Sequence, residues 1–88
     1  MQNPYSSLQA QSPLADAQQS VGKVHRAVKQ AQSHPSDETV ENAYNAINKA
    51  ENALSQAAGS LNQEPLQRAY EDLQQDQADL EQVEDLLN

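Results

Sequence analysis

The chain has 88 residues, with 13 Asp and Glu against 5 Lys and Arg, giving a formal net charge of −8. Cys, Phe and Trp are absent, which excludes disulfides, thiolate metal sites and cysteine nucleophiles, and leaves Ala, Leu and Val to build a core. The acidity disfavours direct nucleic-acid binding. There is no apolar run of the ~20 residues that a membrane span needs, and no signal-peptide pattern, so we expect a soluble, cytoplasmic protein.

Residues 1–12 contain Pro4, several Ser and Gln, and few apolar side chains, so we predict a mobile N-terminal arm. Ser12 is a favourable N-cap and Pro13 suits the first helical position. Apolar residues then recur every three or four positions, which predicts a helix over about residues 13–32: Leu14, Ala17, Val21, Val24, Val28 and Ala31.

The stretch "SHPSD" interrupts this spacing. Pro35 disfavours helical geometry at His34, and Ser36 can cap a second helix whose first turn holds Asp37 and Glu38. We therefore interpret the break as a corner between helices. The second helix is predicted over about residues 37–58, with Gly59 in a left-handed conformation at its end. Its apolar positions are Val40, Ala43, Ile47, Ala50, Leu54 and Ala57.

A turn at residues 60–62 leads to a third predicted helix over about residues 63–87. Its apolar stripe includes one carboxylate and reads Leu66, Ala69, Leu73, Asp76, Leu80, Val83 and Leu87. Three helices of similar length with short connections predict an all-α, up-down-up antiparallel three-helix bundle over residues 13–88. The alternative is a helical hairpin that completes its core by dimerising. We expect a monomer, with a dimer as the alternative.

Asp76 interrupts the third stripe at a level where the antiparallel geometry also places Tyr44 and His25. A buried carboxylate is costly without partners. We therefore expect Asp76 either to accept hydrogen bonds from His25 or Tyr44 in a shared polar layer, or to turn out to solvent. Such a layer would fix the register among otherwise interchangeable Ala, Leu and Val layers.

The third helix is also strongly acidic, which makes it a candidate interaction face: Glu71, Asp72, Asp79, Glu81, Glu84 and Asp85. It could bind a basic patch on a protein or imitate a nucleic-acid backbone. The intramolecular alternative is that Lys23, Arg26 and Lys29 of the first helix lie beside it, because helices 1 and 3 of such a bundle run parallel.

No pattern indicates catalysis. Neither His25 nor His34 belongs to a helical metal-binding pair, no Ser lies in a nucleophile elbow, and the two glycines cannot form a phosphate-binding loop. We predict no enzyme activity, no metal and no cofactor. The sequence favours a small helical protein that acts by binding an unknown protein partner, without a membrane. The alternative is an acidic mimic or antagonist of a nucleic-acid-binding protein.

The stretch "AYNAINKAENALSQAAGSLNQEPLQRAYEDLQQ" combines an Ala-rich helix, a "SLNQEPL" turn and a Gln-rich final helix. In this pattern and composition, residues 14–87 resemble small helical proteins of spore-forming bacilli. The resemblance implies a bacterial cytosolic protein with a link to sporulation or stress. It carries over no functional residue.

Overall fold

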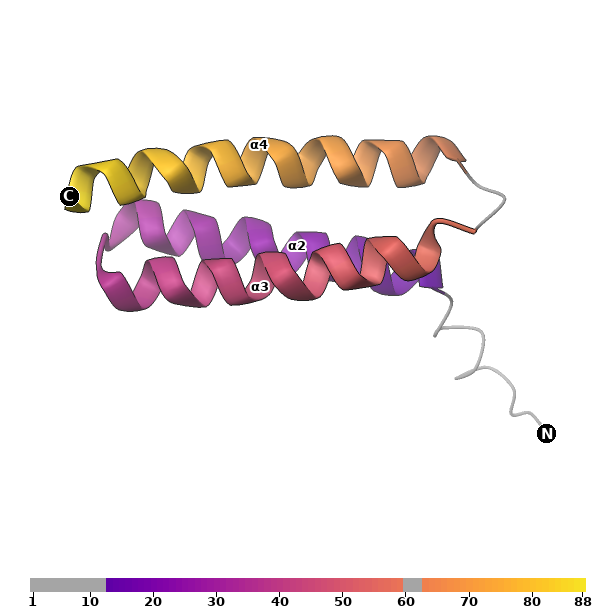
Figure 1. Ribbon diagram of the computed structural model, residues 1–88, viewed down its shortest axis with the longest axis horizontal. Helices are drawn as coiled ribbons and strands as arrows, with labels where there is room; N and C mark the ends of the chain where they lie inside the picture. Colours follow the sequence, from indigo (N-terminus) through magenta and orange to yellow (C-terminus); the bar gives the residue numbers. More distant parts are fainter. Residues whose placement is uncertain (1–12, 60–62) are drawn as a thin grey trace.

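The structure is a computed structural model that describes residues 13–59 and 63–88 (Figure 1). These residues form three helices, α2 (Pro13–Ser33), α3 (Asp37–Ala57) and α4 (Gln63–Leu87). Helices α2 and α4 run in the same direction and α3 runs in the opposite one, so the predicted all-α, up-down-up three-helix bundle is confirmed. The predicted arm, the Ser12 cap and the turn at 60–62 lie outside the described residues. No described helix has the length and apolarity to cross a lipid bilayer.

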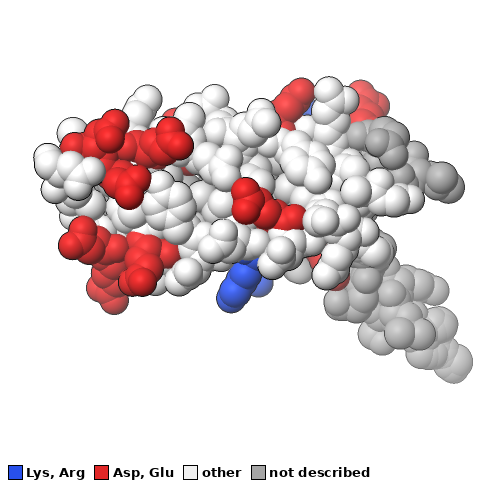
Figure 2. All heavy atoms as spheres, viewed as in Figure 1, with Lys and Arg blue, Asp and Glu red and all other residues white. Residues whose placement is uncertain are grey.

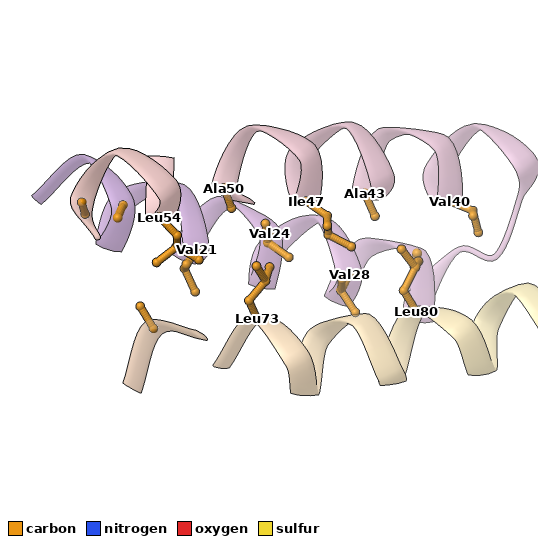
Figure 3. Close-up of a cluster of buried hydrophobic side chains, with 14 of the residues drawn as sticks. Val21, Val24, Val28, Val40, Ala43, Ile47, Ala50, Leu54, Leu73 and Leu80 are labelled. Atoms are coloured by element: carbon orange, nitrogen blue, oxygen red, sulfur yellow. The ribbon is translucent and has the colours of Figure 1, made fainter. Parts of the chain in front are cut away.

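The core is formed by the apolar stripes of the three helices. Every expected core position of α3 is buried, and α2 and α4 lose only their terminal members, Leu14 and Leu87, to partial exposure. Leu73 and Leu80 of α4 point into the space between α2 and α3 (Figure 3). Helix α4 thereby covers the open side of the α2–α3 core within one chain. In the alternative, a helical hairpin that dimerises, a second copy of the chain would cover it.

Helices α2 and α3 make the most extensive contact of the three pairs. Their facing stripes contain several fully buried alanines, among them Ala17, Ala31, Ala43 and Ala50. Small side chains allow two helix backbones to approach closely. Helix α4, which contributes larger leucines to the core, packs across both helices with less contact to each.

The corner between α2 and α3 is built as expected around Ser36, which has extended geometry (φ −161°, ψ 161°) and caps α3. Its side-chain oxygen accepts from the Thr39 backbone N–H at 3.1 Å. In return, the Thr39 hydroxyl oxygen accepts from the Ser36 backbone N–H at 3.1 Å and lies 2.9 Å from the His34 carbonyl oxygen. This is a capping box in which Thr replaces the usual Glu or Gln.

The expectation that Gly59 adopts a left-handed conformation is wrong, since neither described glycine has a positive φ. Helix α3 is instead followed by Ala58 as its C-cap, which keeps right-handed geometry and donates its N–H to the Ser55 carbonyl at 3.3 Å. A bond to the residue three positions earlier tightens the last turn and satisfies a terminal carbonyl without a left-handed residue.

We predict that Thr39→Ala lowers the free energy of unfolding by about 1 kcal/mol, because it removes one half of the capping box and the contact to His34. Urea unfolding followed by circular dichroism measures the change. Thr39→Ser retains the hydroxyl and should stay near the wild-type value. Equal stability of Thr39→Ala and wild type would show that the cap is dispensable.

Candidate functional site

A buried carboxylate lies between α2 and α4. Asp76 is 3% exposed, and its Oδ1 lies 3.1 Å from Nδ1 of His25. Opposite an ionised carboxylate, which only accepts hydrogen bonds, Nδ1 would be the protonated nitrogen and the donor. The His25 side chain is 58% exposed, so the imidazole connects the buried carboxylate to solvent. The alternative in which Asp76 turns outward is excluded.

Tyr44 does not join this pair, which corrects the expected three-residue layer. Its hydroxyl donates to Oε1 of Glu84 at 2.8 Å. Helical side chains lean toward the N-terminus of their own helix, which carries the Tyr44 hydroxyl toward the start of α3 and the last turns of α4. Asp76 also lies on the side of α4 that faces α2, whereas Glu84 faces α3.

A groove between α2 and α4 surrounds the buried pair. Gln18, Gly22 and Arg26 of α2 and Asp72 and Gln75 of α4 contribute to its walls. The Arg26 guanidinium lies beside Gly22. Among residues 13–59 and 63–88, no group of three or more His, Asp and Glu side chains could hold a metal ion.

The intramolecular alternative, with the basic residues of α2 beside the acids of α4, holds for Arg26 but not for Lys23. Arg26 lines the α2–α4 groove, whereas Lys23 lines a groove between α2 and α3 together with Lys49. Over the described part of the chain, no Lys or Arg forms an ion pair with a carboxylate, and the His25–Asp76 contact is an ion pair only where the imidazole is protonated. The acidic charge of α4 is therefore not neutralised by ion pairs within the fold.

The six acids proposed for one face of α4 occupy different sides of that helix. Asp72 faces α2 across the groove, Glu84 contacts α3, and Glu71, Glu81 and Asp85 are exposed. Asp79 is half-buried and accepts from Gln75 at 3.1 Å. The acids of α4 thus do not make a single continuous face.

A different acidic surface forms at one end of the bundle. Figure 2 shows Asp and Glu side chains gathered at the end where Figure 1 places the α2–α3 corner and the last turns of α4. We call this surface the acidic end, and it joins the start of α3 to the end of α4: Asp37, Glu38, Glu41, Glu81, Glu84 and Asp85. Lys29 of α2 and Lys49 of α3 are the basic residues nearest to it along the chain, each eight positions away, from Asp37 and Glu41 respectively.

A groove crosses the acidic end between α3 and α4. Val40 and Tyr44 of α3 and Leu87 of α4 supply its apolar surface, and Asp37, Glu41 and Glu84 supply carboxylates. We call this the end groove. The hydrogen bond to Glu84, burial, and the negative charges of Glu84, Glu81 and Asp85 raise the pKa of Tyr44 above its ordinary 10.0.

The end groove was not expected from the sequence, because its two walls are 40 residues apart in the chain. The relevant signals were present but separate: acids in the first turn of the second helix, and acids beside Leu86 and Leu87 in the third. Antiparallel packing brings them together. Thr39 was also overlooked, since capping boxes are usually recognised by Glu or Gln.

Comparison of the chain with protein-family models, with curated proteins and with solved structures found no match. The candidate sites are therefore defined by the geometry of the chain itself.

We predict that Asp76→Leu is at least as stable to heat as wild type, because a leucine in the apolar stripe avoids the cost of burying a carboxylate. If the pair fixes the register of α4, the variant should also lose its single set of sharp NMR resonances or change its oligomeric state. Asp79→Leu, outside the stripe, is the control. A uniquely folded, monomeric Asp76→Leu protein would show that the pair does not set the register.

We predict that Tyr44 ionises above pH 10, because the nearby carboxylates oppose a negative phenolate. The folded state holds this proton more tightly than the unfolded state, so the resulting stabilisation is present below pH 10 and is lost as the pH rises through the folded-state pKa. The difference between the ultraviolet titrations of wild type and Tyr44→Phe reports this midpoint. Glu84→Gln should lower it, and Glu71→Gln, which removes an equal charge elsewhere, should lower it less.

Proposed function

We propose that this protein is not an enzyme and acts by binding a positively charged partner protein through its acidic end. The observation that carries the proposal is the segregation of charge. Six of the 13 acidic residues belong to the acidic end, and none of them is paired with a Lys or Arg. A surface of one sign attracts a partner of the opposite sign and speeds association.

The position of these acids supports a binding role over a purely structural one. The C-terminus of a helix carries partial negative charge, and cations stabilise it. The last turn of α4 contains no basic residue, and Glu84 and Asp85 belong to it. Each such carboxylate costs about 0.3–1 kcal/mol when exposed, so folding stability does not favour the acids at the end of α4, whereas Asp37 and Glu38 in the first turn of α3 stabilise that helix.

Imitation of a nucleic acid is the alternative. A mimic needs carboxylates spaced along one face, as phosphates are along a strand, whereas the acids of α4 divide among its sides. This distribution favours a compact contact with a basic protein.

The proposal includes a monomeric protein in the bacterial cytoplasm, as expected from the sequence.

Affinity capture from the source organism tests the proposal. One variant neutralises four residues of the acidic end: Glu38→Gln, Glu41→Gln, Glu81→Gln and Asp85→Asn. The matched variant removes the same charge toward the opposite end of the bundle: Asp16→Asn, Glu64→Gln, Glu71→Gln and Asp72→Asn. We expect a basic protein that binds wild type and the matched variant and is lost from the first, with weaker capture at about 500 mM than at about 50 mM salt.

Capture that persists at high salt and is equal for both variants would contradict a role for the acidic end. A captured protein that binds nucleic acid, and that added double-stranded DNA releases, would support the mimic.

A further inference from the structure

The last turn of α4 presents apolar side chains to solvent. Leu86 is 78% exposed and Leu87 is 38% exposed, and Tyr70 is the remaining large hydrophobic side chain exposed among the described residues. Helix α4 reaches beyond the corner between α2 and α3 (Figure 1), so α2 and α3 cover its final residues only in part. Exposed leucines that border other apolar surface mark a candidate interaction surface.

One of these leucines belongs to the end groove. Leu87 lines that groove with Val40 and Tyr44, and the carboxylates of Glu41 and Glu84 line it as well. The acidic end therefore combines an apolar strip with carboxylates beside it. A purely charged surface would attract any polycation, whereas an apolar strip between carboxylates selects for a matching order of side chains.

We propose that the end groove and Leu86 bind a basic amphipathic helix of a partner protein. Its apolar side chains would pack on Tyr44, Leu87 and Leu86, and its Lys or Arg side chains would contact Glu41 and Glu84. This inference rests on the proposed function and specifies the chemistry of the partner. Helix-in-groove recognition of this kind takes its affinity from apolar anchors and its orientation from charge.

Other occupants fit less well. A second copy of the chain would bring a second set of the same carboxylates to the surface, which opposes self-association there. Residues 1–12 contain no Lys or Arg, and they join the chain at the start of α2, at the opposite end of the bundle from the corner (Figure 1). A basic partner segment satisfies both the charge and the exposed leucines.

The test uses a synthetic peptide of about 14 residues made of Leu and Lys in helical spacing, and a second peptide of the same composition in scrambled order. Amide chemical shifts of the labelled protein are followed in NMR titrations. With the amphipathic peptide, we expect the changes to concentrate at Val40, Tyr44, Leu86 and Leu87. The scrambled peptide should bind at least about tenfold more weakly, because it cannot present its leucines on one face.

A protein variant provides the second readout. Leu86→Ser combined with Leu87→Ser should weaken binding of the amphipathic peptide by about tenfold or more, since it removes the apolar anchors. Tyr70→Ser, which alters the other exposed hydrophobic side chain of α4, should leave binding unchanged. Circular dichroism verifies that both variants fold.

Equal affinity for the two peptides, or no effect of the double Leu variant, would overturn the groove proposal. Salt-sensitive binding of both peptides in that case would leave the proposed function standing. Absence of binding by either peptide at low salt would contradict both proposals.

Discussion

The absence of Phe and Trp constrains everything else in this fold. A core of Ala, Val and Leu can exclude water only if the helices approach closely. Helices α2 and α3 meet this requirement through facing alanines, including Ala17 and Ala43, which are fully buried. The leucines of α4 then fill the space on the third side. Little room remains inside such a bundle, and the grooves that could bind a partner lie between helices at its surface.

The same constraint makes Asp76 distinctive. Successive layers of small apolar side chains resemble one another, so sliding one helix by a turn would cost little packing energy. A carboxylate in the stripe can be satisfied only at the level where a donor is present, and His25 supplies that donor. The half-exposed imidazole also lets one side of the pair remain hydrated, which reduces the desolvation cost of a fully buried ion pair.

The fold could be predicted because its information is local and periodic. Apolar residues three and four apart identified the three helices, and Pro35 and Ser36 located the corner. The level of His25 relative to Asp76 followed from counting along two parallel helices. Tyr44 was misplaced because counting gives the level of a backbone position and ignores the lean of the side chain. Gly59 was misjudged because a tightened last turn satisfies the same carbonyls as a left-handed residue.

The end groove could not be anticipated by reading one helix at a time. It depends on the reach of α4 beyond the corner and on the side of α4 that faces α3, and both are set by tertiary packing. Two hydrogen bonds link these helices, from Tyr44 to Glu84 and from Gln77 to Glu51. Moving seven residues forward along α3, from Tyr44 to Glu51, corresponds to moving seven residues back along α4, from Glu84 to Gln77. This register brings Leu87 beside Val40.

The separation of His25 and Asp76 by 51 residues constrains the order of assembly. Contacts between α2 and α3 close a short loop, whereas those between α2 and α4 close a long one and carry a larger entropic cost. The α2–α3 pair also has the most extensive contact of the three, so we expect this hairpin to form first and α4 to be the helix that detaches most easily. A ligand that binds α3 and α4 at once would oppose the detachment of α4 from the other two helices.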